Sequence, residues 1–559
     1  MPKSERESRS ADDGGASHRN HAWVFVLIVA LLLIGLSLDG KHYWHEVRFV
    51  YVATQFSLED ALAGVFNPHQ AGGPIDELGA AGFYSTKLLH IFLLKAWFRL
   101  MAPDAGGFVL ACFGSLLAML ATIMIFFDFF RRLHLPDLEP RWGLVCLLVA
   151  PITPYLAGKL LSEVTSLLFL AGALWAFLVG LQSRSRLSGL GAMGISTVAL
   201  VLSALARLDL ALSFAGFCLA AALFLPDVGR GRRRIAASGA AVAAIGGLLY
   251  TGSLLSLGVD PRALLQYLSS YIALHPKSHV MSLLGLLTVG GLVYLPALVA
   301  LSQRSRAAKF FGVWWVLAAL PMIAITANYM VEPRYLAASL VPLAGLGGVG
   351  LSAFWKKKPR RRAVALAAAV IIIAAGNYVL IGLMPFELDR TALLGVVDDV
   401  RQRSADAAIL VPWAYTDYHF LRVMAQDGQI YNVNTPSGKT SDLADAWRAR
   451  FRDWYGRGYL DDPRRLREML AERRAYYVGW RKYPPLQEWI LRARGFGFDR
   501  WADLLEGIPL QDHIQTSWLW DANGFRLTKE ESETARDLGM SEKQYYDNKM
   551  LLKKEGRLQ

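Results

Sequence analysis

The stretch SEVTSLLFLAGALWAFLVGLQSRSR, residues 162–186, has charged residues at both ends and none between Glu163 and Arg184. A helix needs ~20 mainly apolar residues to cross the hydrocarbon core of a bilayer. The stretch therefore predicts a membrane-spanning helix over residues 164–182, with ionisable side chains near each membrane surface.

The same pattern recurs along the chain from Ala22 to Met384. Hydrophobic residues make up 54% of the 559 residues and charged residues 19%, which is less charge than a soluble protein of this length would carry. The sequence thus predicts a polytopic α-helical membrane protein with about eleven spans. The predicted spans are residues 22–38, 106–127, 142–158, 164–182, 187–206, 208–225, 235–258, 280–301, 310–331, 335–354 and 363–384.

The N-terminal segment, residues 1–20, is polar and has no apolar periodicity, so we predict a disordered tail. The apolar run that follows has no small-residue cleavage site and ends directly at Asp39. We therefore predict a retained first span rather than a signal peptide, and a membrane domain over residues 21–384.

The short loops between the predicted spans alternate in charge. One set holds eighteen basic residues, at positions 131, 132, 141, 184, 186, 230, 232–234, 304, 306, 309, 356–358 and 360–362. The other set holds five, at positions 159, 207, 262, 277 and 334. The positive-inside rule places the first set in the cytoplasm, which predicts a cytoplasmic N-terminus and an extracytoplasmic (periplasmic) C-terminal domain in a bacterial inner membrane.

The net charge of +13 has the same origin, since much of the basic excess lies in these loops. Such loops meet anionic lipid headgroups, so we expect membrane lipids as partners and no nucleic acid. The three cysteines, Cys112, Cys146 and Cys218, all lie in apolar runs without a CxxC motif, which argues against a disulfide framework or a thiolate zinc site.

Residues 83–101 are apolar but carry Lys87, His90, Lys95 and Arg99, spread over about half of the helix surface. A lipid-facing span would not tolerate these charges, whereas an interfacial or re-entrant helix would. We predict a juxtamembrane helix here and a second one at residues 42–66, both within an outer loop over residues 39–105.

Ionisable residues gather at the predicted outer ends of the spans: Asp39, Lys87, His90, Lys159, Glu163, Arg207, Asp209, Glu332 and Arg334. Such groups are costly at membrane depth, so a cluster on one face predicts a polar functional site. The alternative is that each is an ordinary loop charge or a local ion pair, such as an i,i+4 pair between Lys159 and Glu163.

The order of these motifs is similar to that of the GT-C superfamily of glycosyltransferases, which use polyprenyl-phosphate sugars and include protein O-mannosyltransferases and lipid A aminoarabinose transferases. Asp39 with Tyr43 and Glu46 resembles the first outer loop of that superfamily. Four later stretches resemble further family segments: GFYSTKLLHIFLLKAWFRL (82–100), LAGKLLSEVTSLLFLAGALW (156–175), LARLD (205–209) and EPRYLAASLVPL (332–343).

The resemblance implies a GT-C-like membrane domain that moves a sugar, with inversion, from a polyprenyl-phosphate donor to a lipid, glycan or protein acceptor. The candidate catalytic residues are Asp39, as general base, Glu46 and Glu163. The candidates for the donor phosphate are Lys87, Lys159, Arg207 and Arg334. The candidates for substrate contact are Tyr43, His90, Asp209, Glu332 and Tyr335.

The sequence departs from the superfamily's pattern at a position that bears on metal binding. Many family members carry two adjacent acids after the first span, whereas Gly40 follows Asp39 here and the next acid is Glu46. A hard divalent cation needs several oxygen ligands together, so this departure disfavours a divalent metal, and we assign no metal ligand.

The C-terminal domain, residues 385–559, alternates short apolar runs with helical periodicity. Residues 408–413, 429–433 and 475–480 predict buried strands. Residues 391–403, 414–426, 441–455, 463–473 and 484–494 predict helices. Together they predict a small soluble α/β domain with a charged tail, which the resemblance would place at the acceptor entrance.

Two other functions remain open at this level. A transporter or lipid flippase would show internal repeats and charges at the middle of the membrane, and the chain has no internal repeat. A non-catalytic assembly protein is the third reading. The sequence names neither the sugar, the acceptor nor the polyprenol.

Overall fold

The computed structural model divides into two compact units, Met1–Lys41 with Val52–Met384 and His42–Tyr51 with Pro385–Gln559. The structure describes residues 41–43, 49–50, 53–54, 87–102, 105–225, 227–228, 231–258, 260–262, 279–326, 333–356, 368–377, 387–389, 397–398, 401–402, 405–411, 430–432, 475–478, 480–481, 512–514, 519–520 and 537–538.

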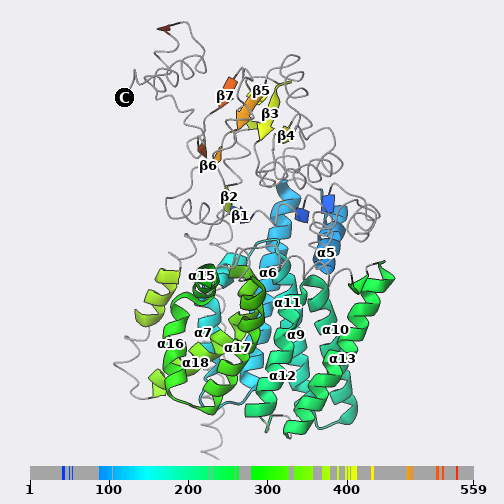
Figure 1. Ribbon diagram of the computed structural model, residues 1–559, viewed down its shortest axis with the longest axis vertical. Coiled ribbons are helices and arrows are strands. Elements are labelled where there is room, and N and C mark those ends of the chain that lie inside the picture. Colours follow the sequence, from blue (N-terminus) through cyan, green and yellow to red (C-terminus); the bar gives the residue numbers. More distant parts are fainter. Residues whose placement is uncertain are drawn as a thin grey trace, which may run out of the picture. The chain divides into compact units, whose positions relative to one another are not determined.

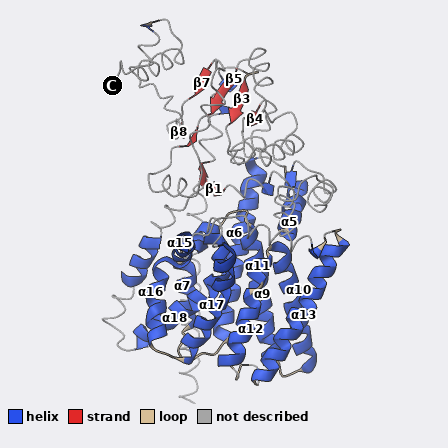
Figure 2. Cartoon of the chain, in the orientation of Figure 1, coloured by secondary structure: helices blue, strands red, loops and turns tan. Residues whose placement is uncertain are grey.

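The first unit is a bundle of helices (Figures 1 and 2). Its α-helices are α5 (Leu88–Leu100), α6 (Ala105–Arg132), α7 (Pro140–Val149), α8 (Ile152–Leu156), α9 (Ser162–Gln182), α10 (Arg186–Ala206), α11 (Leu208–Ala211), α12 (Ser213–Phe224), α13 (Arg232–Ser256), α15 (His279–Gly290), α16 (Tyr294–Ser302), α17 (Arg306–Thr326), α18 (Leu340–Lys356) and an unlabelled helix Ala368–Asn377. Two 3₁₀ segments, η1 (Gly291–Val293) and η2 (Pro333–Ser339), precede α16 and α18.

Within these described ranges, six helical stretches are long and apolar enough to cross a membrane. They are α6, α9, α10, α13, Gly285–Ser302 and Arg334–Phe354, and three shorter apolar helices accompany them. The multi-pass membrane character is thus confirmed. The count of about eleven spans stays a prediction, because residues 22–38 and parts of other predicted spans lie outside the described residues.

Two predicted spans are broken by the backbone. The span at 142–158 is divided between α7 and α8, because Ala150 is extended (ψ 132°) before Pro151. The span at 280–301 is divided at Gly291, whose φ of +53° suits glycine. Asn377 bonds to both breaks: its Oδ1 accepts from Leu292 N (2.8 Å) and its Nδ2 donates to Val149 O (2.6 Å). One side chain thus satisfies backbone groups freed inside the bundle.

Helix α5 covers the first predicted juxtamembrane helix and has 13 residues, fewer than the ~20 that a span requires. Its charged residues His90 and Lys95 lie on the buried face with Leu88, Ile91 and Leu94. The second predicted helix, residues 42–66, is wrong at its start. There, strand β1 (Lys41–Tyr43) pairs with β2 (Glu387–Asp389), a distant partner that local periodicity cannot reveal.

The loops of the bundle lie at two opposite ends, since α9 alone is about 30 Å long at 1.5 Å per residue. At one end, Gln182 Nε2 donates to Arg132 O (2.7 Å), and Arg306 Nη1 pairs with Asp227 (2.7 Å). The members of the basic set that the structure describes, from Arg131 to Lys356, belong to this end. Glu163, Arg207 and Arg334 lie at the other. Which end faces the cytoplasm stays a prediction.

In the second unit, β3 (Ala408–Val411), β4 (Ile430–Asn432), β5 (Ala475–Val478) and β7 (Asp512–Ile514) form a parallel sheet in the order β4-β3-β5-β7. A separate antiparallel pair joins β6 (Trp480–Arg481) to β8 (Leu519–Trp520). The three predicted strands are confirmed. Most of the predicted helices lie outside the described residues, so the α/β domain as a whole stays a prediction.

Candidate active site

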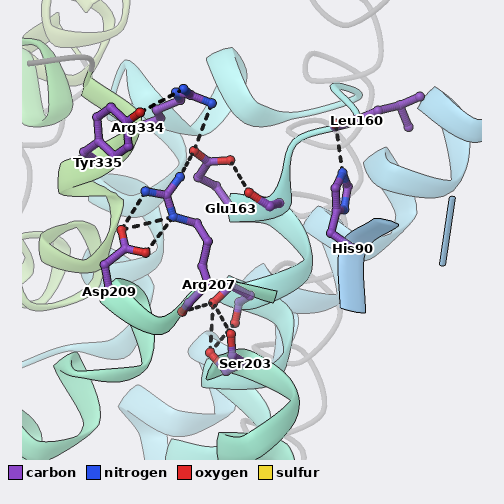
Figure 3. A network of polar contacts seen from close by, with 10 residues as sticks. His90, Leu160, Glu163, Ser203, Arg207, Asp209, Arg334 and Tyr335 are labelled. Carbon is purple, nitrogen blue, oxygen red and sulfur yellow. Dashed lines mark hydrogen bonds and ion pairs between the residues drawn. The ribbon is translucent and has the colours of Figure 1, made fainter. Parts of the chain in front are cut away.

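A group of buried charged side chains lies where several helices of the bundle begin or end (Figure 3). We call Lys87, Glu163, Arg207, Asp209, Arg334 and Tyr335 the cationic cluster. Glu163 and Arg334 are 0% exposed, and Arg207 is 3% exposed. Burial at this level is costly for an ionised group, so the contacts within the cluster must compensate for lost hydration.

The ends of secondary structure elements position the cluster. Glu163 is in the first turn of α9, and Arg207 is the residue between α10 and α11, where the backbone is extended. Asp209 lies in α11, while Arg334 and Tyr335 lie in the first turn of η2. Lys87 immediately precedes α5. Residues far apart in the chain therefore converge at one end of the bundle.

All three guanidinium nitrogens of Arg207 contact carboxylates. Its Nη1 forms an ion pair with Glu163, while Nε and Nη2 bind the Asp209 carboxylate at 2.8 and 2.7 Å. This two-bond geometry fixes the plane of the guanidinium, as is usual for arginine with a carboxylate.

Arg334 approaches the same carboxylate oxygen of Glu163, with Nη1 at 3.5 Å from Oε1. Its Nη2 donates to Tyr335 Oη at 3.3 Å. The Tyr335 ring faces both cations, with its centroid 4.8 Å from Arg207 Cζ and 4.9 Å from Arg334 Cζ. Tyr335 and Glu163 thus hold two guanidinium groups beside each other despite their like charges.

Lys87 lies close enough to interact electrostatically with Glu163, Arg207, Asp209 and Arg334. Burial, followed by the charges of Arg207 and Arg334, lowers the pKa of Lys87 well below its ordinary value of 10.5. The cluster therefore holds three basic and two acidic side chains. One basic group more than acidic ones suits an anion, and a phosphate most of all, because its oxygens can accept from several donors at once.

Buried serines join the helices that carry the cluster. Ser166 on α9 and Ser203 on α10 donate to each other's backbone carbonyls at 3.0 Å. Arg207 N donates to Ser203 O at 2.7 Å, which closes the last turn of α10. Neither serine was among the residues predicted for the site, although each lies in an apolar run three or four residues from a predicted site residue.

The predicted site residues have different outcomes. Glu163, Arg207, Asp209, Arg334 and Tyr335 are in direct contact, and Lys87 is near them. Glu163 pairs with the two arginines, while the i,i+4 pair with Lys159 is not formed within the described part of the chain. Lys159 is buried just before α9, where its carbonyl accepts from Ser115 Oγ.

His90 contacts protein groups through both ring nitrogens, as described below. Asp39, Glu46, Glu332 and the side chain of Tyr43 lie outside the described residues, so their roles stay predictions. In the part of the chain that the structure describes, no group of three His, Cys, Asp or Glu side chains could hold a metal ion.

Fold and site together define a polytopic helical membrane protein with a buried cationic cluster at one end of its bundle. No protein-family model matches the chain, and no curated protein matches it either.

Solved structures resemble it in arrangement. ArnT from Cupriavidus metallidurans in the apo state has 14% identity and a TM-score of 0.48, covering 85% of this chain and 95% of its own. The same protein bound to undecaprenyl phosphate has 15% identity and a TM-score of 0.48, with coverages of 80% and 91%. The Archaeoglobus fulgidus oligosaccharyltransferase in the apo form has 11% identity and a TM-score of 0.42, with coverages of 72% and 63%.

Proposed function

We propose that this chain is a membrane glycosyltransferase that transfers a sugar from a polyprenyl-phosphate donor to an acceptor on the extracytoplasmic side. The observation that carries the proposal is the cationic cluster. Its three basic groups are buried, converge from α5, α10 and η2, and exceed the acidic groups by one. A leaving phosphate requires such a set of fixed donors, since they stabilise charge that develops as the sugar departs.

The reaction would proceed as a single displacement with inversion. Asp39 would accept the proton of the acceptor hydroxyl, whose oxygen attacks the anomeric carbon. The bond from that carbon to the phosphate oxygen breaks, and its electron pair stays on the phosphate. Lys87, Arg207 and Arg334 would hold that phosphate, with Lys159 as the fourth predicted cation.

Glu163 suits a positioning role better than the catalytic role that the sequence suggested. Its Oε1 is engaged by two guanidinium groups, and Ser162 Oγ donates to Oε2 at 3.2 Å. A carboxylate held in this way orients the arginines, and it is poorly placed to take a proton from a substrate. Asp209 would orient Arg207 in the same manner.

The location of the cluster also favours sugar transfer over transport as the function. A transporter predicts charges near the middle of the bilayer. Here Glu163 lies in the first turn of α9, Arg207 follows the last residue of α10, and Arg334 is the second residue of η2. Sites at helix ends favour chemistry at one membrane surface.

Binding of undecaprenyl phosphate, the lipid in one of the similar structures, tests the cluster directly. Purified protein in nanodiscs should bind this lipid and should bind the uncharged alcohol undecaprenol far more weakly. Arg334→Gln should weaken phosphate binding by about tenfold or more, since it removes a charged donor. Arg186→Gln, an exposed residue at the opposite end of the bundle, is the control and should bind as wild type does.

Thermal melting confirms that each variant is folded, and Arg334→Lys, which retains charge but not the guanidinium fork, should be intermediate. Equal binding by folded Arg334→Gln, or equal binding of undecaprenol, would overturn the proposed phosphate site. Analysis of lipid-linked products in a deletion strain then identifies the sugar, and the strain should not be rescued by Asp39→Asn.

A further inference from the structure

His90 joins α5 to the segment that carries Glu163. Its Nε2 lies 3.0 Å from Leu160 O, two residues before α9, and its Nδ1 lies 3.0 Å from Thr165 Oγ1, in the first turn of α9. The imidazole is 4% exposed, and Figure 3 shows it on α5 facing the segment before α9. The two contacts therefore bracket Glu163 on either side in the sequence.

The hydrogen-bond partners determine the proton positions on this ring. A backbone carbonyl only accepts, so Nε2 carries the proton and donates to Leu160 O. In the neutral ring Nδ1 then accepts from the Thr165 hydroxyl. If the ring gains a proton, the hydroxyl rotates and accepts instead, so both contacts persist in either charge state.

Lys87 is three residues before His90, which places the two side chains on the same side of the chain one turn apart. Burial and the charges of Arg207 and Arg334 disfavour a protonated Lys87 in the cationic cluster. A helix of 13 residues that delivers a basic group into such a site needs an anchor close to that group. Lys95 Nζ, which donates to Ala53 O at 3.4 Å, contacts the chain farther along α5.

We propose that His90 is a positioning residue that holds Lys87 in the cationic cluster by anchoring α5 to Leu160 and Thr165. The inference rests on the proposed function, in which Lys87 binds the donor phosphate. It changes the predicted role of His90 from substrate contact to an indirect one. Loss of the anchor would let α5 move so that Lys87 leaves the cluster, while the Arg207–Glu163 pair remains.

A double-mutant cycle on undecaprenyl phosphate affinity tests this dependence. His90→Phe keeps a similar ring volume but removes both hydrogen bonds, and it should weaken binding about as much as Lys87→Met, by about tenfold. If His90 acts through Lys87, His90→Phe should have no further effect in the Lys87→Met background, whereas independent roles would add. Additive losses would overturn the proposal.

His90→Gln should restore binding, since an amide can donate to Leu160 O and accept from Thr165. Leu93→Ala is the control on α5, because that side chain is 47% exposed. Reduced binding by Leu93→Ala equal to that of His90→Phe would indicate general damage to the helix and would also overturn the proposal.

A second measurement does not depend on donor binding. Labelling of Lys87 by an amine-reactive reagent, quantified by mass spectrometry, should be slow in wild type and His90→Gln, because this side chain is buried. It should be several-fold faster in His90→Phe and intermediate in Thr165→Val. Unchanged labelling would refute the anchor. If Lys87→Met binds the lipid as wild type does, the proposed phosphate site fails, and labelling alone still decides the role of His90.

Discussion

Glu163 shows how one residue determines the character of the site. Its carboxylate is shared by Arg207 and Arg334, with the Arg334 Nη1 contact at 3.5 Å, and none of the three side chains is more than slightly exposed. Removal of the shared carboxylate would leave two guanidinium groups buried beside each other, with Asp209, which binds Arg207, as the remaining carboxylate of the cluster. The attraction between this carboxylate and the two guanidinium groups holds the side chains in place, and a bound phosphate would attract the same guanidinium groups.

Glu163→Gln should therefore lower the stability of the protein. Breaking a buried ion pair by removing one partner costs about 3–5 kcal/mol, which thermal melting in detergent detects as a large fall in Tm. Glu139→Gln is a matched control, because Glu139 pairs with Arg141 at 2.6 Å on the surface, where both side chains are at least 36% exposed. That exposed pair should contribute less than about 1 kcal/mol. Equal melting of the two variants would contradict a compensating role for Glu163.

Substitution of Lys87, in contrast to that of Glu163, should impair phosphate binding without lowering the stability of the protein. Because burial and the neighbouring arginines lower its pKa in the folded protein, its charged form is disfavoured by folding. Lys87→Met should then melt at the same or a higher temperature than wild type, while phosphate binding falls by about tenfold.

The difference in Tm between Lys87→Met and wild type should depend on pH in one direction. The penalty on Lys87 is complete at pH values below its folded pKa, shrinks above that value and vanishes near 10.5, where the unfolded residue also loses its proton. The excess Tm of Lys87→Met over wild type should therefore decrease as the pH rises from 7 toward 10. An excess that grows with pH would contradict the lowered pKa.

At the scale of elements, breaks and close approaches shape the bundle as much as the spans do. Helix α18 contacts α16 where a Cβ on Gly350 would clash with the Pro296 carbonyl oxygen, a backbone atom that cannot rotate away. Trp314, fully buried, donates from Nε1 to Ser213 O at 3.0 Å and joins α17 to α12. These contacts hold the helices whose ends carry Arg334 and Asp209.

Gly350→Ala should consequently destabilise the bundle by about 1–3 kcal/mol, the usual cost of overpacking. Gly247→Ala on α13 is the control, since a Cβ there meets nothing within 4 Å. The control should melt at or above the wild-type temperature, because alanine favours helix over glycine. A Gly350→Ala variant as stable as Gly247→Ala would show that α16 and α18 do not approach so closely.

At the scale of the whole molecule, the basic loop residues that the structure describes lie at the opposite end of the bundle from the cationic cluster. The Gln182–Arg132 and Arg306–Asp227 contacts mark one end, and Glu163 with Arg207 marks the other. If the positive-inside rule holds, the cluster faces the extracytoplasmic side, where a lipid-linked donor would be used.

Topology reporters check this orientation. Alkaline phosphatase, which folds only outside the cytoplasm, should be active when fused after Gln559 and inactive when fused near Arg232. A fluorescent protein that requires the cytoplasm should give the reverse result at the same two positions. Activity of the phosphatase at Arg232 alone would invert the predicted topology and place the cationic cluster in the cytoplasm.

The sequence by itself determined the membrane character, the apolar stretches of α6, α9 and α10, the three strands of the second unit, and the basic residues that meet in the cationic cluster. Runs of apolar residues and the polar residues that end them are local features, so composition and spacing reveal them. The sequence also predicted a helix too charged to face lipid where α5 lies, because Lys87, His90, Lys95 and Arg99 are spread over residues 83–101.

Only the tertiary structure decided which of these residues meet. Glu163 pairs with Arg207 and Arg334. Asn377 bonds to two helix breaks 85 and 228 residues away in the chain, and His90 contacts Leu160, 70 residues away. Each depends on how helices pack, which sets the side-chain directions at their ends. Local patterns carry no information on such long-range pairing, because the same ionisable residue can be a loop charge, an anchor or a ligand until its neighbours are in place.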